Sequence, residues 1–193
     1  MDIILWKEWS KAFFELRSAF SRQTTFLWAA VFCAGIAIRN NTRGVTSIVD
    51  VFGLQAKSYD CLLGLFHSSA VKLDLLVSCW VRLCFKLFRP VCIEGHMVIF
   101  GDGIKVGKEG KKMPAVKLMH QSSQSNSKAE YVMGHYLQAL SLAVTTPSGN
   151  IAAVPLTSRI HDGLVFSNRS QKTVINRFAD IISETSAAVG TPR

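Results

Sequence analysis

The segment Met97–Gly107, with the sequence MVIFGDGIKVG, determines the fold class expected for this chain of 193 residues. Its opening run, Met97–Phe100, is continuously apolar, which is typical of a buried strand, and Ile104–Val106 can continue it. The glycine- and lysine-rich stretch that follows, 107–112, predicts a polar turn. Because helical periodicity precedes this segment and strand-like runs follow it, the sequence predicts an α+β protein.

Three further strands and one helix are predicted after this turn. Pro114–His120 and Leu137–Thr145 are apolar runs of strand length. The sequence PSGN at 147–150 is a turn signal, so Ile151–Leu156 should form a hairpin with the strand before it. The tail Ser170–Ala188 carries apolar residues at helical spacing, which predicts a final helix.

Helical spacing dominates the chain from residue 1 to about residue 92. The predicted helices cover residues 1–21, 24–38, 58–66 and 71–87, together with a short helix capped by Thr46 or Ser47 that runs through Phe52. The two short helices on either side of Gly53 have the shape of a helix-turn-helix, for which ordinary bundle packing is the alternative. Pro90 ends the last helix, so we expect a helical region at 1–92 and a strand-rich region at 93–193.

The composition favours a polyanionic partner. The net charge is +9, and 49% of the residues are hydrophobic, which excludes a disordered chain. Residues 1–95 hold 11 Lys and Arg against 7 Asp and Glu, and the remainder holds 11 against 6, so both halves are basic. Nucleic acid or an anionic membrane surface would suit such a charge.

Two features of the first half have plain structural interpretations. The apolar stretch Thr24–Ile38 is shorter than the roughly 20 residues of a membrane span, so a buried helix is favoured over a membrane anchor. The cysteines lack the spacing of a zinc site or of a disulfide framework, and we interpret them as small buried hydrophobic residues. They are Cys33, Cys61, Cys79, Cys84 and Cys92.

The stretch FGDGIKVGKEGKK, 100–112, is the segment most relevant to function. It is not a phosphate-binding P-loop, because only three residues separate Gly103 from Gly107 and no hydroxyl residue follows the lysine. It is not a dinucleotide-binding motif either, because no helix with the required glycine spacing follows. A plain glycine hairpin and a metal site at Asp102 are the two interpretations that remain.

The metal interpretation rests on the position of Asp102. A carboxylate at the end of an apolar strand is costly to bury unless it is paired or bound to a metal. Mg²⁺ takes one or two carboxylates together with water and phosphate oxygens, and the flanking glycines would let a DNA strand approach the backbone closely. Four lysines lie where phosphates would pass: Lys105, Lys108, Lys111 and Lys112.

The region Ile99–Asn168 resembles the catalytic region of insertion-sequence transposases with an Asp-Asp-Glu triad and a ribonuclease-H-like fold. The matching features are a strand with an aspartate, a lysine-rich turn, a second strand ending in LMHQSSQS, and KAEYVMGHYLQALSLAV followed by a hairpin to VPLTSRIHDG. The resemblance implies that Asp102 is the first triad carboxylate and that Mg²⁺ or Mn²⁺ is the cofactor. It further implies cleavage and transfer of double-stranded transposon DNA by a cytoplasmic, nucleoid-associated protein, and it allows a homodimer.

The chain departs from the family pattern in its late carboxylates. The second aspartate and the glutamate of the triad lie on elements beyond the final helix, and no residue here takes their places. Asp162, Asp180 and Glu184 lie in a turn and on the tail helix, and are not expected to bind metal. We therefore expect an N-terminal helical region followed by an incomplete ribonuclease-H-like mixed sheet, truncated at its C-terminus and inactive alone.

Several residues are expected to contact DNA if the resemblance holds. Besides the four lysines after Asp102, these are Arg43, Lys57 and His135. His135 and His161 could also act as acid–base groups, although a structural role is the favoured interpretation. Two other classes of protein stay open: a non-catalytic DNA-binding protein, and a membrane-associated helical protein.

Overall fold

The structure is a computed structural model, and it describes residues 3–41, 44–107, 113–120, 131–161 and 174–190. The chain divides into two compact units, Met1–Leu83 and Cys84–Arg193. The division falls inside a helix, before the boundary that the sequence suggests after residue 92. We refer to the first part as the helical unit and to the second as the sheet unit.

Four of the five helices of the first half begin and end within two residues of their predicted bounds, whereas the first ends at Phe14, seven residues before its predicted end at Ser21. The helices are α1 Ile3–Phe14, α2 Gln23–Ile38, α3 Val45–Val51, α4 Lys57–Phe66 and α5 Leu73–Leu87, with a short 3₁₀ turn, η1, at Arg17–Ala19. Glycines with positive φ mark both sides of α3: Gly44 at 68° and Gly53 at 58°. Glycine reaches this conformation without a steric penalty, which explains why α3 is short.

An apolar core holds the helical unit together. Phe13, Phe20 and Phe26 are buried and their rings are in contact, with centroids 5.2 and 5.5 Å from that of Phe26. Cys79 and Leu83 of α5 belong to the same core. The amphipathic spacing of the sequence therefore corresponds to a real interior.

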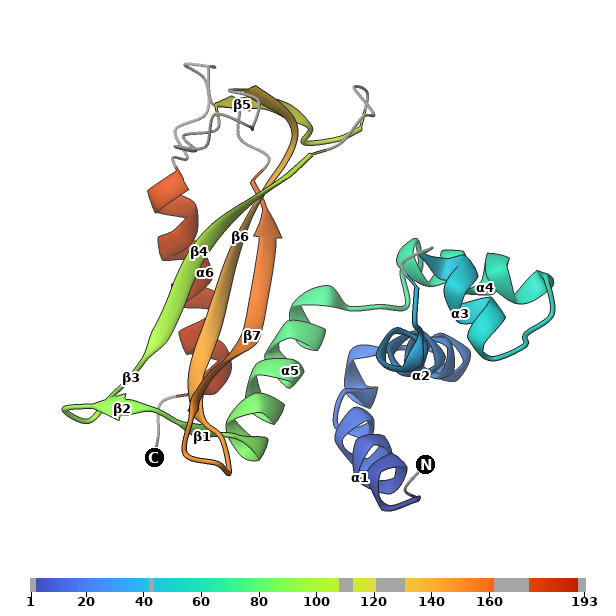
Figure 1. The fold of residues 1–193 in the computed structure, drawn as a ribbon, viewed down its shortest axis with the longest axis horizontal. Coiled ribbons are helices and arrows are strands. Elements are labelled where there is room, and N and C mark those ends of the chain that lie inside the picture. Colours follow the sequence, from blue (N-terminus) through green and yellow to red (C-terminus); the bar gives the residue numbers. More distant parts are fainter. Residues whose placement is uncertain (1–2, 42–43, 108–112, 121–130, 162–173, 191–193) are drawn as a thin grey trace. The chain divides into compact units, whose positions relative to one another are not determined.

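The sheet unit is built around one long strand, β6 Tyr131–Thr145. β4 Ile99–Gly107 pairs with one edge of β6, and β7 Ile151–Ile160 pairs with the other. The short strands β5 Lys117–His120 and β1 Arg89–Pro90 pair with the two ends of β6. Figure 1 shows the three long strands side by side, with β5 where the start of β6 curves away.

All these pairings are antiparallel. The α+β class is confirmed, but the parallel strand that a mixed sheet requires is not found among the residues described. A small hairpin of β2 Cys92–Ile93 and β3 His96–Met97 precedes β4.

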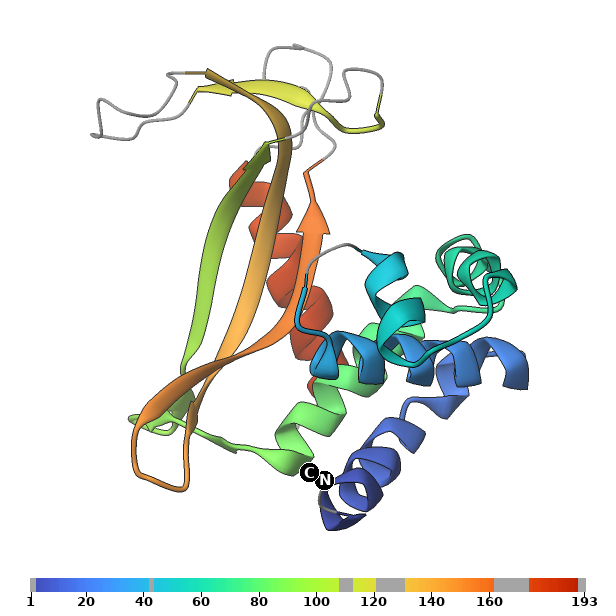
Figure 2. The same ribbon diagram turned by 45° about the vertical axis from the view of Figure 1, so that its right-hand side comes forward.

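One helix, α6 Val174–Val189, covers one face of this sheet. Figure 2 shows α6 lying behind β6 and β7. The buried residues Leu140 and Leu142 of β6, Leu156 of β7 and Ile181 of α6 form the interior here. A register shift follows Leu140, where β6 pairs first with Thr157 and then with Pro155.

Candidate functional site

Asp102 lies in the middle of β4, directly opposite Ala139 of β6. The strand continues to Gly107, so Asp102 is not at the strand's end, as the sequence had suggested. Its side chain is exposed, and its Oδ1 accepts a 2.7 Å hydrogen bond from the backbone N–H of Gly103. Water therefore reaches the Asp102 carboxylate, which does not need a metal or a partner to offset a cost of burial.

The glycine before Asp102 faces α6. A Cβ atom at Gly101 would lie 3.3 Å from the ring of Phe178 and 3.4 Å from the side chain of Leu140. Successive side chains of a strand point to opposite faces, so Asp102 projects from the other face of the sheet. We call that surface of β4, β6 and β7 the Asp102 face.

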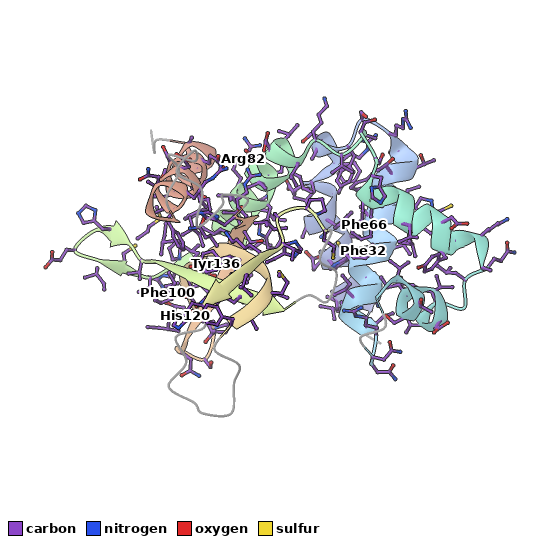
Figure 3. All side chains as sticks on the ribbon, turned by 90° about the horizontal axis from the view of Figure 1, so that it is seen from above. Phe32, Phe66, Arg82, Phe100, His120 and Tyr136 are labelled. Atoms are coloured by element: carbon purple, nitrogen blue, oxygen red, sulfur yellow. The ribbon has the colours of Figure 1, made fainter. Side chains whose placement is uncertain are left out.

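The glycine after Asp102 makes room for Tyr136. A Cβ atom at Gly103 would overlap the hydroxyl and the ring of Tyr136, which lies on β6 opposite Lys105. Figure 3 labels the Tyr136 side chain on the sheet. Both glycines therefore accommodate aromatic side chains on the α6 side. The prediction that they let DNA approach the backbone beside Asp102 is not supported, because they face away from that surface.

The neighbours of Asp102 on its own face are exposed and apolar. Phe100, Ile104 and Val106 of β4 are 47%, 51% and 36% exposed. Across the sheet, Ala139 separates Asp102 from Ser158 of β7. A single carboxylate among apolar side chains can bind a cation whose remaining ligands are water or oxygen atoms of a partner.

The late carboxylates that the structure describes do not join Asp102. Glu184 and Asp180 belong to α6, which packs against the opposite face, and Glu184 is 3.1 Å from Arg159 in an ion pair. Asp162 lies outside the described residues. The residues that the structure describes contain no group of three or more His, Cys, Asp or Glu able to hold a metal.

The predicted DNA-contacting cations are only partly placed. Lys105 is exposed, and its Nζ donates a 2.7 Å hydrogen bond to the backbone oxygen of His120, linking β4 to β5. Lys57 is the exposed first residue of α4, in the other unit. Four predicted contacts lie outside the described residues: Arg43, Lys108, Lys111 and Lys112.

His135 is part of the interior. It lies within β6 opposite Val106, whereas the sequence suggested a position just before the strand. It is only 8% exposed, and its Nε2 is 2.9 Å from the backbone oxygen of Pro114. His135 thus ties β6 to the turn before β5, and we leave it out of the DNA-contacting set.

The sequence did not reveal a cluster of Lys117, Tyr136 and His161. The Nζ of Lys117 donates to Nδ1 of His161 at 2.8 Å and to its backbone oxygen at 3.2 Å. The same Nζ lies 5.9 Å from the centre of the Tyr136 ring. These residues come from β5, from the end of β7 and from β6, so only the strand register brings them together.

In the helical unit, α3 and α4 are two short helices joined across Gly53, in the order that the sequence predicts. The N–H of Leu54 donates a 2.9 Å hydrogen bond to the backbone oxygen of Val49, closing the end of α3 at the turn. Ile48 of α3 and Leu62 of α4 are fully buried, which fixes the pair of helices. The exposed first turn of α4 carries both Lys57 and Asp60, so the surface at this end of the helix is not strongly basic.

Comparisons of the chain with protein-family models, with curated protein sequences and with solved structures found no match. Within the described residues, no helix is long and apolar enough to cross a membrane. The apolar helix α2 has 16 residues, against the roughly 20 that a span requires.

Proposed function

We propose that this protein binds double-stranded DNA through its sheet unit and that Asp102 helps to hold a Mg²⁺ or Mn²⁺ ion against the DNA backbone. The observation that carries this proposal is the exposed carboxylate at the centre of β4, on the face that α6 does not cover. Lys105 is exposed on the same strand, but strand alternation places it on the opposite face, where its Nζ reaches the backbone oxygen of His120. Three antiparallel strands followed by a helix also match the order of elements in the transposases that the sequence resembles.

The charges of the chain support a phosphate-bearing partner. A net charge of +9 attracts DNA from a distance, while Asp102 alone would repel it. A divalent ion bound at Asp102 would reverse that local repulsion and neutralise charge on a phosphodiester. Because Asp102 is the one described carboxylate at this position, we expect the ion to bind weakly until oxygen atoms of the DNA phosphates complete its coordination.

The test of the metal site is paramagnetic broadening by Mn²⁺ in ¹⁵N NMR spectra of the full chain. We expect broadening of the amide signals around Asp102, and stronger broadening when a DNA duplex is added. Asp102→Asn should remove the effect, whereas Asp180→Asn, on α6, should leave it unchanged. Equal broadening in wild type and Asp102→Asn would reject Asp102 as a ligand.

A non-catalytic DNA-binding protein is the second candidate, and the α3–turn–α4 geometry favours it specifically. In this case α4 would contact DNA and Asp102 would have no role. The two candidates differ in the lysine on which DNA affinity depends: Lys105 for the sheet unit and Lys57 for α4. Titration of a duplex with Lys105→Ala and Lys57→Ala variants separates them.

A further inference from the structure

The helical unit contains an apolar cavity of about 710 Å³. This volume lies within the range of roughly 300–1,000 Å³ that is usual for small-molecule sites. Residues of α1, α2, α4, α5 and the segments between them contribute to the wall. Its aromatic residues are Trp9, Phe13, Phe20, Phe32, Phe66 and Trp80.

The wall of the cavity is almost entirely hydrocarbon. Among the described residues that line it, only Ser68 and Cys33 carry a hydroxyl or a thiol, and none is charged. Desolvation raises the pKa of the Cys33 thiol above its usual value, so this group also stays neutral near pH 7. A charged ligand would lose its hydration here without a compensating partner, whereas a neutral hydrocarbon would lose nothing.

Part of the cavity wall is exposed to solvent. Phe66 and Trp80 line the cavity and are 56% and 36% exposed. The rings of Phe32 and Phe66 meet edge to face with centroids 5.0 Å apart, and Figure 3 shows these two side chains next to each other. Ring faces that border empty space lack van der Waals partners, and a ligand would both supply them and remove apolar surface from water.

We propose that the helical unit binds a neutral, mostly hydrocarbon small molecule in this cavity. The uncharged wall selects against carboxylates and ammonium groups, and the aromatic rings favour an alkyl chain or an aromatic ring system. One polar atom, such as an alcohol oxygen, could be placed at Ser68 or Cys33. This site is independent of Asp102 and of the proposed DNA contacts.

The test uses 11-bromo-1-undecanol as the probe, with the full chain. Bromine quenches tryptophan fluorescence on contact, and Trp9 and Trp80 both line the cavity. We expect saturable quenching by the alcohol and binding about tenfold weaker for 11-bromoundecanoate, which has a charged head group. Equal or tighter binding of the carboxylate would overturn the proposal.

A filling substitution locates the site. Ala29 is a buried lining residue of α2, so Ala29→Phe should abolish saturable quenching. Ala37 is exposed on the same helix, and Ala37→Phe is the matched control that should still bind. Retained quenching in a folded Ala29→Phe protein, shown by an unchanged circular dichroism spectrum, would overturn the proposal.

A second measurement on the wild-type protein does not depend on the folding of any variant. Cys33 and Cys92 are both exposed cysteines. Undecanol should slow the alkylation by iodoacetamide of Cys33, which lines the cavity, several-fold and leave that of Cys92, in the sheet unit, unchanged. Absence of protection at saturating alcohol would overturn the proposal. The proposal would also be overturned if sedimentation showed a dimer that dissociates when undecanol is added, because the cavity would then be covered by a second copy of the chain.

Discussion

Gly101 and Gly103 flank Asp102, and each leaves space for an aromatic side chain. Phe178 of α6 lies against Gly101, and Tyr136 of β6 lies against Gly103. Both rings are on the side of the sheet opposite Asp102. The Gly-Asp-Gly pattern therefore holds β4 close to its neighbours, and the exposed position of Asp102 follows from strand alternation.

Gly103→Ala should destabilise the protein by about 1 to 3 kcal/mol, because the added methyl group would overlap Tyr136. Gly107→Ala is the matched control on the same strand, since a Cβ there meets nothing within 4 Å. Urea denaturation measures both. Combining Gly103→Ala with Tyr136→Ala should recover part of the loss, and a double variant whose losses simply add would contradict this explanation.

The Cys84 thiol should be inert in the folded protein. Burial raises its pKa to about 11, and its side chain is fully buried. At pH 8, iodoacetamide should modify the exposed Cys61 and Cys92 while Cys84 reacts only in denaturant, as mass spectrometry of digests would show. Modification of Cys84 at the rate of Cys92 would contradict its burial.

The same shift makes stability depend on alkaline pH. The unfolded chain releases the Cys84 proton near pH 9, whereas the folded chain holds it to about pH 11. Between these values the folded state binds more protons, so stability should fall as pH rises from 9 to 11. A Cys84→Ala variant should lose this component of the pH dependence, which denaturant melts at pH 8 and pH 10.5 would measure.

The helices were predictable from sequence because their signals are local. Apolar residues three and four apart, polar breaks and positive-φ glycines all lie within one helix length, and α2 begins within one residue of its prediction. The strands were less predictable. β6 starts at Tyr131, six residues before its prediction, because Gly134 and His135 lack strand character and are held there by pairing with β4 and β5.

The start of β5 shows a local cause for a similar difference. The sequence predicts a strand from Pro114, but β5 begins at Lys117. Proline cannot donate to a strand ladder, and Ala115 has a φ of 59°, which is incompatible with an extended strand. The backbone preferences of residues 114–116 therefore predict the start of the strand better than their apolar side chains do.

Gly35→Ala and Gly64→Ala should have opposite effects on the helical unit. A Cβ at Gly35 of α2 would lie 2.5 Å from Cγ2 of Ile48 in α3, so the two helices would have to separate. A Cβ at Gly64 of α4 meets nothing within 4 Å, and alanine is favoured over glycine in helices by about 1 kcal/mol. We expect Gly35→Ala to lower the free energy of unfolding by about 1 to 3 kcal/mol and Gly64→Ala to raise it by up to about 1 kcal/mol.

Thermal and urea denaturation of both variants tests this contrast. When Ile48→Ala is combined with Gly35→Ala, the loss in the free energy of unfolding should be smaller than the sum of the two single losses. The smaller residue at position 48 leaves space for the new methyl group. A stabilised Gly35→Ala protein would mean that α2 and α3 do not pack closely.

At the scale of the whole molecule, the candidate site was predictable only in part. That Asp102 lies on a strand followed from the apolar run, whereas its place in the middle of that strand did not. The face on which it lies, and the clustering of Lys117 with His161, depend on the register of β6 with its neighbours. Register is fixed by contacts between residues far apart in the sequence, which no local pattern records.

The salt dependence of DNA binding tests the role of the whole basic chain. If several cations contact phosphates, log affinity should fall by about 0.9 per phosphate contact for each decade of salt. Lys105→Ala should weaken binding and lower this slope by about one, whereas Lys57→Ala should leave both unchanged if the sheet unit is the DNA-binding part. Fluorescence anisotropy of a labelled duplex at several salt concentrations measures the slopes.

Asp102→Ala completes this series in metal-free buffer. Removing a negative charge close to the DNA should leave the affinity unchanged or increase it, because no ion is present to bridge carboxylate and phosphate. With Mg²⁺ added, the wild-type protein should gain affinity and Asp102→Ala should not. A DNA affinity that does not change with salt would contradict DNA as the partner. An equal gain in affinity with Mg²⁺ in both proteins would leave DNA as the partner but show that Asp102 does not bind the ion.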